Sequence, residues 1–356
     1  MMISGEVMLI AALVFSIFMG YGLNAFFLNQ PIKFLLKKAN KSAIRWNSQS
    51  KPIFGGITFY SIFIIGFLAY ILLIDQTVAL DSRYIALFIV VTLAFLMGLA
   101  DDIINTPPVF KFVIQMLIAV ILISFDIFIS ISPHPLLNYA ITIFWVVGIM
   151  NSINMLDNMD SVANLVSISV FAGAFVLMVA DKGMNGFMPF MILFALGACL
   201  SFLMFNWHPS KMYMGDNGSQ FLGSMLAYIG IVSFWNSIPQ EIVSYGLNSK
   251  QVIVVLLAFI VPITDTATVS INRILRGQSP FIGGRDHTTH YLAYAGLSDR
   301  KVAVLLFLIN LISVAMACYI IFAISNWSSM WFWLFFAWFL IIFVGLYMLT
   351  KIVKQK

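Results

Sequence analysis

Charged residues are scarce in this chain. Asp, Glu, Lys and Arg together make up 9% of its 356 residues, whereas a soluble globular protein averages about 25%. Hydrophobic residues make up 62% and the mean hydropathy is +1.00, against about 45–50% apolar residues in soluble proteins. This composition excludes an ordinary soluble enzyme and predicts an integral membrane protein.

Cysteine is almost missing as well. The two cysteines, Cys199 and Cys318, fall inside long apolar stretches, so they predict neither a disulfide framework nor a zinc site. The polar gaps reach only about 20–25 residues, which is too short for a separate soluble domain. The net charge of +5 requires no nucleic-acid partner, and a basic inner surface fits anionic lipids and phosphate-bearing substrates.

Long apolar runs are what the chain has in abundance. Their length suits about eleven membrane helices of about 20 residues each. The first run is too long for a signal-peptide core and has no basic segment before it, so we expect it to be a helix. The sequence predicts an all-α polytopic membrane protein in which residues 1–356 form a single transmembrane domain. The expected spans are 4–28, 53–74, 83–100, 108–131, 136–151, 161–180, 187–205, 218–235, 250–272, 301–323 and 329–350.

Positive charge is distributed unevenly among the gaps. Of the 19 Lys and Arg residues, all except Arg83, Lys182 and Lys250 fall in gaps or a tail that would emerge on one side of the membrane. Cytoplasmic loops are enriched in Lys and Arg. We therefore expect an outside N-terminus and a cytoplasmic C-terminus.

Clusters of Asp, Asn, His and Lys occupy every second gap. Alternate gaps between membrane-spanning helices emerge on the same side of the bilayer, so these clusters are expected together on the cytoplasmic face. An integral membrane enzyme with a one-sided substrate needs this arrangement. The loops concerned are residues 29–52, 100–111, 151–161, 206–218 and 273–300.

Two adjacent carboxylates, Asp101 and Asp102, close the third expected span. Negative charge at a helix C-terminus opposes the helix dipole. A locally unfavourable pair indicates use as a metal, phosphate-site or proton-transfer group. A solvated helix end is the alternative interpretation.

Amide and carboxylate side chains recur in the next cytoplasmic gap. Asn151, Asn154 and Asp157 follow one another every three residues, and Asp160 continues the series. In a helix such residues share roughly one face. Their oxygens are hard ligands that suit Mg²⁺ or Mn²⁺. The alternative is a polar turn, although turns rarely interleave Asn and Asp with Ile, Met and Leu.

The segment 205–219 combines Lys211, Asp216 and a Gly-Asp-Asn-Gly sequence. Glycine lets the backbone approach a ligand closely, so Asp216 could hold a metal while Lys211 neutralises phosphate charge. As a bare pattern, Asn217-Gly218 also fits a turn followed by a helix.

Two histidines, His287 and His290, lie three residues apart after Arg285. Such a pair can bind Zn²⁺, but the chain lacks a Glu in a zincin arrangement. Histidines also donate hydrogen bonds to phosphates, and we prefer phosphate contact. The other two histidines are explained by turns, because His134 lies between two prolines and His208 precedes Pro.

Taken together, these clusters resemble the motifs of the polyprenyl-phosphate N-acetylhexosamine-1-phosphate transferase family, also named glycosyltransferase family 4. The family includes bacterial enzymes that start O-antigen and teichoic-acid linkage synthesis, and the phospho-MurNAc-pentapeptide translocase. The resemblance runs in order from Lys51 to Leu292. The matching segments are Pro52 to Ile57 (Pro-x-x-Gly-Gly), Asp101-Asp102 (paired aspartates), Lys111 with Gln115 (Lys-x-x-x-Gln), Asn151 to Asp160 (Asn-x-x-Asn-x-x-Asp-Gly-x-Asp-Gly), Asn206 to Gly218 (Phe-Asn-x-x-Pro-x-Lys-x-x-Met-Gly-Asp-x-Gly, the most specific) and His287 to Leu292 (His-x-His-His).

The chain departs from the family pattern at three positions. Asn158 and Ser161 replace the usual glycines around Asp160, which bears on the preference for sugar or nucleotide. Thr289 replaces the middle histidine and so removes one phosphate donor. Because the loop lacks the histidine triplet of the translocase type, the resemblance favours a simple UDP-N-acetylhexosamine over the pentapeptide nucleotide.

The resemblance implies a reaction at a bacterial inner membrane. Undecaprenyl phosphate attacks the sugar-bearing phosphate of a UDP-N-acetylhexosamine, UMP leaves, and a polyprenyl-diphospho-sugar remains among the membrane lipids. Both reactants are anionic, so a divalent metal and basic side chains must neutralise their charge. The acceptor phosphate has a second pKa of about 6 and is mostly dianionic at pH 7. A homodimer is compatible with this family.

The resemblance also implies roles for individual residues. Asp216 and Asn154 would hold Mg²⁺, with Mn²⁺ as a second choice. Asp101 and Asp102 would orient or deprotonate the lipid phosphate, and Asp157 is expected to act with them as a catalytic residue. The residues expected to bind substrate are Lys111, His287, His290 and Arg285 at phosphates, Lys51, Asp160 and Asn206 at uridine, Tyr213 as a ring contact, and Asn151 and Lys211.

Other functions are weighed against this one. A pentapeptide translocase would share the reaction but take a larger nucleotide. A prenyltransferase would need Asp-rich diphosphate sites and no histidine loop. A transporter places ionisable groups near the bilayer midplane and often has repeats, and here Asp126 and Asp265 are the acidic candidates without an evident repeat. A membrane scaffold leaves the ordered motifs unexplained.

Overall fold

The computed structural model describes residues 4–29, 51–75, 77, 81–184, 186–237, 248–280 and 284–354. Within these ranges the chain is helical, apart from its loops and one isolated β-bridge between Ile53 and Tyr213. The helices are α1 (Gly5–Leu28), α2 (Gly55–Leu73), α3 (Ser82–Ile104), α4 (Pro108–Ser124), α5 (Pro135–Leu156), α6 (Val162–Lys182), α7 (Phe187–Asn206), α8 (Gly215–Ile229), a π-helix (Gly230–Trp235), α9 (Ser249–Ala258), α10 (Ile260–Leu275), α11 (Thr288–Tyr294), α12 (Asp299–Ala323) and α13 (Ser329–Ile352).

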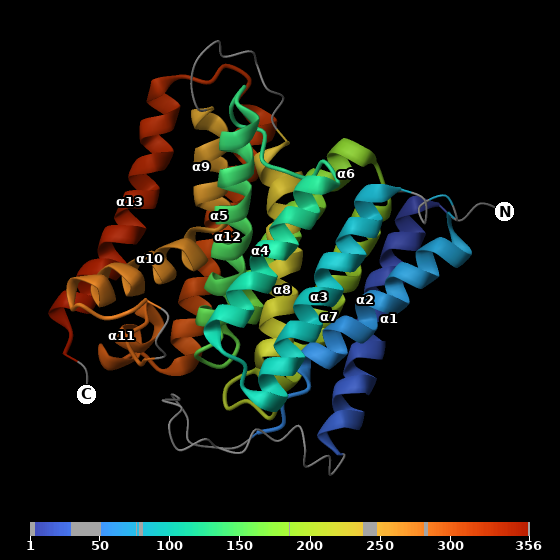
Figure 1. Ribbon diagram of the computed structural model, residues 1–356, viewed down its shortest axis with the longest axis horizontal. Helices are drawn as coiled ribbons and strands as arrows, with labels where there is room; N and C mark the ends of the chain where they lie inside the picture. The colour runs from blue at the N-terminus through green and yellow to red at the C-terminus, as the bar shows by residue number, and fades with distance from the viewer. Residues whose placement is uncertain are drawn as a thin grey trace.

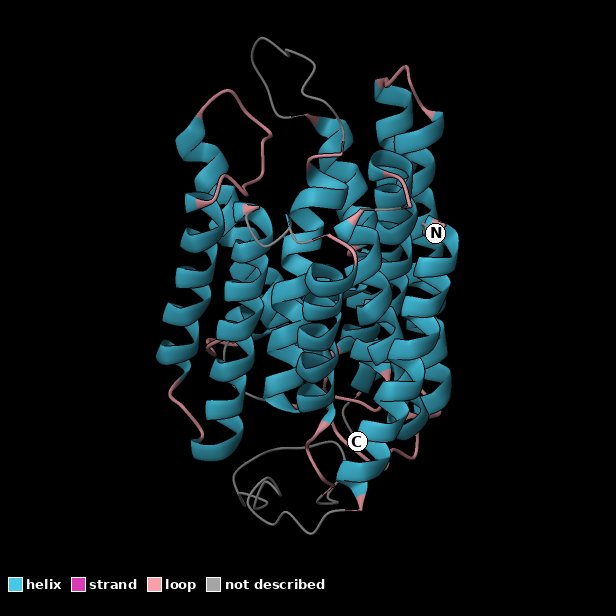
Figure 2. Cartoon of the chain, turned by 90° about the vertical axis from the view of Figure 1, so that its right-hand side faces the viewer, coloured by secondary structure: helices cyan, strands magenta, loops and turns pink. Residues whose placement is uncertain are grey.

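Most of these helices run roughly parallel, and their connections gather at the two ends of the bundle (Figure 1 and Figure 2). Among the described residues, eight helices are long and apolar enough to cross a bilayer, and α9 with α10 makes a ninth if the bent pair is one span. The expected all-α, multi-pass membrane architecture is confirmed. The difference from eleven spans lies in α4 and α8, which have only 17 and 15 residues.

Helix α7 lies at the centre of one half of the bundle. In its most apolar window 83% of the residues are buried, against 17% for α13, which therefore lies at the edge, where lipid would surround it. Helix α1 packs closely on α7 because small residues face each other at two levels. A Cβ at Gly20 would overlap Ser201, and a Cβ at Gly197 would overlap Ser16. Such contacts are the usual way for membrane helices to approach.

Helix α4 ends earlier than the sequence indicates. The expected span was 108–131, but the helix stops at Ser124 and Asp126 lies beyond it in a left-handed turn with φ of 60°. The following apolar residues are extended, because side chains of other elements satisfy their backbone. Asn138 Oδ1 accepts from Ile131 N and Ser132 N, at 3.2 and 3.0 Å. Hydropathy cannot distinguish this buried extended segment from a helix.

The expected straight span 250–272 is also wrong, because α9 and α10 meet at an angle of 86°. Pro262 has no N–H to donate to Ala258 O, four residues earlier. Asn310 of α12 replaces the missing donor, since its Nδ2 lies 3.3 Å from Ala258 O while its Oδ1 accepts from Val261 N at 3.3 Å. The bend carries α10 across the bundle, as Figure 1 shows.

The first and last helices begin and end at opposite ends of the bundle: α1 starts at the upper end of Figure 1 and α13 finishes at the lower end. This agrees with expected termini on opposite sides of a membrane. The basic residues Lys33, Lys37, Lys38, Lys41 and Arg45 lie outside the described residues, as does most of the loop 29–52.

Candidate active site

The polar motifs meet at one end of the bundle, the lower end in Figure 1. The α3–α4 connection, the end of α5, the α7–α8 loop and the segment before α11 all lie there. Four of the five expected loops are thus brought together by the fold, while the described part of the fifth is Lys51 and Pro52. The gathering of chemistry at one end follows from the alternation of helix direction.

The first turn of α8 carries Asp216 and is held from α3. The helix already begins at Gly215, so Asp216 lies on a helix N-terminus and not in a preceding turn. Asp102 accepts hydrogen bonds from Asp216 N at 3.1 Å, Asn217 N at 2.9 Å and Asn217 Nδ2 at 2.8 Å. A carboxylate that accepts from free N–H groups at a helix N-terminus stabilises that helix.

Glycines permit this close approach of α3 and α8. Gly215 has a φ of +78°, which side chains rarely adopt. A Cβ at Gly98 would overlap the backbone of Asp216. The Gly-Asp-Asn-Gly sequence is therefore needed to bring the helix start against the paired aspartates.

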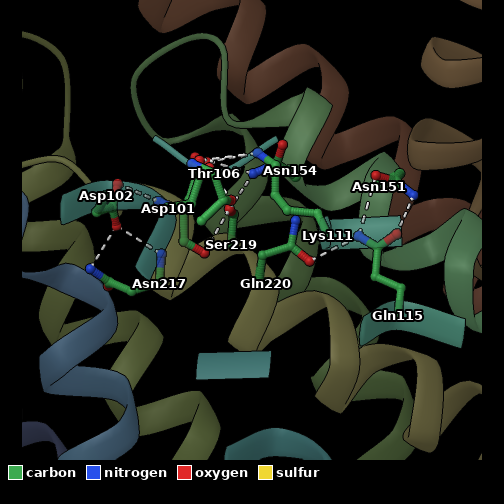
Figure 3. A network of polar contacts seen from close by, with 11 residues as sticks. Asp101, Asp102, Thr106, Lys111, Gln115, Asn151, Asn154, Asn217, Ser219 and Gln220 are labelled. Carbon is green, nitrogen blue, oxygen red and sulfur yellow. Dashed lines mark hydrogen bonds and ion pairs between the residues drawn. The ribbon is translucent and has the colours of Figure 1, made fainter. Parts of the chain in front are cut away.

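A lysine joins two carboxylates in this cluster. Lys111 Nζ lies 3.0 Å from Asp101 Oδ2 and 3.3 Å from Asp216 Oδ2. Asp101 is buried and also accepts from Thr106 N at 2.9 Å and Thr106 Oγ1 at 2.7 Å. Figure 3 shows Asp101, Thr106 and Lys111 beside Asn154. Lys111 thus places a positive charge between two carboxylates that would otherwise repel.

Helix α5 completes the cluster from the other side. Asn154 Nδ2 lies 3.3 Å from Asp216 Oδ1 and 2.8 Å from Ser219 Oγ. One helical turn earlier, Asn151 Nδ2 donates to Gln115 Oε1 at 2.8 Å, and Gln115 Nε2 donates to Gln220 at 3.2 Å. The sequence expectation that Asn151 and Asn154 share a helix face is confirmed, and Figure 3 shows both among the same polar side chains.

The donors around Asp216 fit a divalent cation of the Mg²⁺ type. No three His, Cys, Asp or Glu side chains form a metal-binding group among the described residues. Mg²⁺ does not require such a group, because it keeps several waters and takes one or two carboxylates together with substrate phosphates. Asp216 already faces a cation, the ammonium of Lys111. The amide of Asn154 would have to turn by half a rotation to offer its oxygen.

A second cluster surrounds Asp160. This buried carboxylate accepts from Ser210 N at 3.0 Å and Ser210 Oγ at 2.8 Å, and His208 Nδ1 lies 2.9 Å from it. Lys51 Nζ donates to the same Ser210 Oγ at 3.0 Å and lies 5.1 Å from the centre of the Tyr213 ring. Lys51, Asp160 and Tyr213, which sequence analysis groups at the uridine, therefore meet around one loop.

Asn206 stabilises that loop from inside. Its Oδ1 accepts from Ser161 N at 2.9 Å and its Nδ2 donates to Met212 O at 3.0 Å. The side chain is buried, so both ends of the amide are used within the protein. Lys211, by contrast, is exposed. The structure thus separates the two residues, with Asn206 as a brace and Lys211 at the surface.

The histidine loop is anchored by a carboxylate of the bent helix. Asp265 Oδ2 lies 2.8 Å from His287 Nδ1, while Oδ1 accepts from Thr288 N at 2.8 Å and Thr288 Oγ1 at 2.6 Å. Asp265 and His287 are both buried. Hydrogen bonding to Nδ1 fixes the ring and leaves Nε2 for another partner. Without the bend, Asp265 would not reach this loop.

A second ion pair anchors the same loop. Arg273 donates to both oxygens of Asp286, at 2.9 and 2.6 Å, and its third nitrogen donates to Pro280 O at 2.7 Å. Burial raises the pKa of Asp286, but the hydrogen bonds and charge of Arg273 outweigh burial and hold that pKa below its usual range. Arg285 itself is exposed.

His290 differs from His287 in its surroundings. Burial, together with the neighbouring His287, lowers the pKa of His290 to about 3, so the ring is neutral at pH 7. Its Nδ1 accepts from His287 N at 3.4 Å, which places the ring proton on Nε2. As an expected phosphate ligand, His290 would therefore act as a neutral hydrogen-bond donor.

The end of α5 connects the clusters. Asp157 is half-buried and directly follows the helix. One residue later, Asn158 Oδ1 accepts from Thr289 Oγ1 at 2.6 Å. Residues that sequence analysis did not assign to the site are the anchors Asp265, Asp286 and Arg273 and the partners His208, Ser210 and Ser219. Of these, Asp265 alone carried a signal, as an acid inside an apolar span.

Comparison with known proteins agrees with this geometry. The family described as glycosyl transferase family 4 matches residues 84–234, the stretch from α3 to the π-helix. A probable undecaprenyl-phosphate N-acetylglucosaminyl 1-phosphate transferase of Bacillus subtilis is 27% identical over 315 residues, 86% of this chain and 82% of the relative.

Two other relatives are similar over much of their length. A decaprenyl-phosphate N-acetylglucosaminephosphotransferase of Mycolicibacterium smegmatis is 28% identical over 291 residues, 73% of this chain and 69% of the relative. A phospho-N-acetylmuramoyl-pentapeptide-transferase of Staphylococcus aureus (strain MSSA476) is 30% identical over 290 residues, 74% of this chain and 82% of the relative.

Proposed function

This chain belongs to glycosyl transferase family 4, and from that premise we propose that it transfers N-acetylhexosamine-1-phosphate from a UDP-sugar to undecaprenyl phosphate. An oxygen of the lipid phosphate forms a bond to the sugar-bearing phosphorus, and the bond from that phosphorus to the bridging oxygen breaks. UMP leaves with the electron pair. The relatives named for N-acetylglucosamine support GlcNAc as the preferred sugar.

The observation that carries the proposal is the hydrogen-bonded continuity of the clusters through α5. Asn154 contacts Asp216, and four residues later Asn158 contacts the histidine loop. Asp160, two residues further, binds the loop that carries Lys51 and Tyr213 contacts. A donor with a uracil, a diphosphate and a sugar needs recognition of these different kinds within one site.

Charge neutralisation is the main task of such a site, because both reactants are anions. Lys111, Lys211 and Arg285 supply positive charge, and His287 and His290 supply ring N–H groups. The lipid phosphate provides its own nucleophilic oxygen, since it is mostly ionised at pH 7. The residues therefore bind, orient and neutralise the reactants more than they move protons.

For Asp101 and Asp102, the contacts favour positioning over base catalysis. Asp102 holds the start of α8, and Asp101 holds Lys111. Asp216 and Asn154 would hold Mg²⁺, and when bound the ion would offset the negative charge of the diphosphate and the leaving UMP. Asp102 would then act through Asp216, by fixing the helix that presents it.

The donor is tested by incubating purified protein with undecaprenyl phosphate and a panel of UDP-sugars, and by measuring UMP. UDP-GlcNAc is expected to release UMP fastest. Faster release from the UDP-MurNAc-pentapeptide would indicate the translocase reaction instead. Release from no UDP-sugar would contradict the proposal.

We also propose that the site faces the cytoplasm of a bacterial inner membrane, as the distribution of Lys and Arg indicates. A periplasmic reporter should be active after residues near 78, 134, 183, 243 and 326. A cytoplasmic reporter should be active near 40, 105 and 283 and at the C-terminus. Periplasmic activity at residue 283 would contradict a cytoplasmic site.

A further inference from the structure

One side-chain contact joins the two halves of the site across 131 residues of sequence. Thr289 Oγ1 donates to Asn158 Oδ1 at 2.6 Å. The amide of Asn158 is fixed at its other end, because Nδ2 donates to Met155 O at 2.7 Å. Thr289 has no exposed surface, so loss of its hydroxyl would leave the contact without a replacement from bulk water.

The same two residues are departures of this chain from the family pattern, which has glycine and histidine at their positions. Neither departure suggests the other in the sequence, yet the structure brings them into contact. A glycine at position 158 would offer no acceptor, and a histidine at position 289 would be larger than Thr in a fully buried place. The two exchanges therefore fit each other.

The contact has a specific location relative to the reacting groups. Asn158 follows Asp157 and lies one turn after Asn154, the neighbour of Asp216. Thr289 lies between His287 and His290. The loop is anchored to α10 by Asp265 and Asp286, as described above, and the hydrogen bond to Asn158 ties it to α5.

We infer that Asn158 and Thr289 form a positioning pair, which sets the separation between the end of α5 and the histidine loop and thereby aligns the diphosphate of the UDP-N-acetylhexosamine. The pair replaces a ring that could contact the phosphate with a hydrogen bond inside the protein. This inference rests on the proposed function for its substrate. It makes the pair a determinant of turnover that touches no reacting atom.

Three single variants test the pair by UMP release. Thr289→Val keeps the shape and removes the hydroxyl, and kcat should fall about tenfold while KM changes less, because misalignment acts on the reacting geometry. Thr289→Ser keeps the hydroxyl and should retain most of kcat. Thr92→Val is the matched control, since Thr92 Oγ1 is also partly buried and hydrogen-bonded, to Phe88 O, on a helix stretch away from the site.

The double variant separates a pair from two independent residues. Asn158→Ala with Thr289→Val should be no slower than the slower single variant, because both remove one interaction. Multiplying losses would contradict the inference. Asn158→Gly with Thr289→His, which restores the family pattern, should be faster than either of its single variants.

Hydrogen exchange tests the pair without any turnover. Amides 284–294 should exchange faster in Thr289→Val than in Thr92→Val, while amides 206–213 stay unchanged. Wild-type protein that releases no UMP would contradict the proposed function, and the exchange result would still decide the pair. Unchanged exchange at 284–294, or equal kcat in Thr289→Val and Thr92→Val, would overturn the inference.

Discussion

The two anionic centres of the site are built in different ways. Around Asp216, carboxylates and Lys111 come from four helices and retain access to solvent, since about a quarter of each of the two side chains is exposed (23% and 24%). Around His287, the carboxylate Asp265 is only 1% exposed and its contacts are saturated by the loop. The first centre can exchange partners, whereas the second is fixed within the protein.

This difference separates binding from support. A carboxylate with accessible oxygens and a movable cation beside it can accept a metal or a phosphate-bound ion. A buried carboxylate that accepts several hydrogen bonds instead orients the ring it contacts, as a carboxylate behind a ligating histidine does. Variants at the two centres should therefore differ in metal dependence as well as in rate.

The largest effect is expected for Asp216→Asn. The change removes the charge that faces Lys111 and Asn154, and UMP release should fall by about 10²–10³-fold, the usual loss when a group that stabilises transition-state charge is removed. Asp126→Asn is the control, because Asp126 is exposed in the loop after α4. A rate for Asp216→Asn within a few fold of the Asp126→Asn rate would contradict the assignment.

Chelation tests the same centre in the wild-type protein. Excess chelator should abolish UMP release, and added Mg²⁺ or Mn²⁺ should restore it. Full activity in excess chelator would remove the metal from the proposal.

A smaller effect is expected for Asp265→Asn. The amide can still accept from Thr288 but gives His287 no charged partner, so kcat/KM should fall about 10–100-fold. The Mg²⁺ concentration for half-maximal rate should stay at the wild-type value, since Asp265 belongs to the second centre. A large shift in that concentration would erase the distinction between the two centres.

For Asp102→Asn we expect a loss of stability together with a modest loss of rate. The amide has one acceptor oxygen for the start of α8 where the carboxylate has two, and a lost buried hydrogen bond costs about 1–3 kcal/mol. Thermal unfolding in detergent should occur at lower temperature. Asp101→Asn, which leaves the α8 contacts in place, provides the comparison.

The pH–rate profile of both variants at saturating UDP-sugar distinguishes positioning from base catalysis. If the carboxylates only position groups, the loss should stay flat above about pH 7, where the acceptor phosphate is already ionised. Recovery of rate as pH rises would identify a general base. Wild-type rates in both variants would remove the pair from the site.

The smallest effect concerns His290 and the pH dependence of stability. The unfolded chain binds a proton on this ring near pH 6.5, but burial beside His287 lowers the pKa in the folded protein to about 3. The contribution of His290 to stability is therefore complete above pH 6.5 and is lost as pH falls, by up to about 1.4 kcal/mol per pH unit.

This dependence is measured as the thermal midpoint in detergent between pH 7.5 and pH 5. His290→Gln, which cannot titrate, should show a weaker decline than wild type over this range. Identical slopes for the two proteins would show that His290 is not the responsible group.

The helices and the order of the motifs could be predicted from the sequence. Apolar runs predict membrane helices because each helix satisfies its own backbone hydrogen bonds, and every expected span has a helix or helix pair in the structure. Helix direction alternates, so motifs in alternate gaps had to meet at one end. The shared helix face of Asn151 and Asn154 followed from helical spacing alone.

Departures from the predicted spans arose where a distant side chain satisfied the backbone. Asn138 and Asn236 accept from residues of the extended segment after α4, and Asn310 covers the break before Pro262. Hydropathy describes how apolar a segment is, and it contains no information on such partners. The early end of α4 and the bend of 86° between α9 and α10 were therefore beyond its reach.

What the sequence by itself determined is the class of protein, its helices and the residues available for chemistry at one end. What only the tertiary structure decided is the partner of each residue: Asp102 with the start of α8, Asp265 with His287, and Asn158 with Thr289. The physical reason is distance along the chain. Local periodicity fixes neighbours within a few residues, whereas these contacts depend on how whole helices pack against one another.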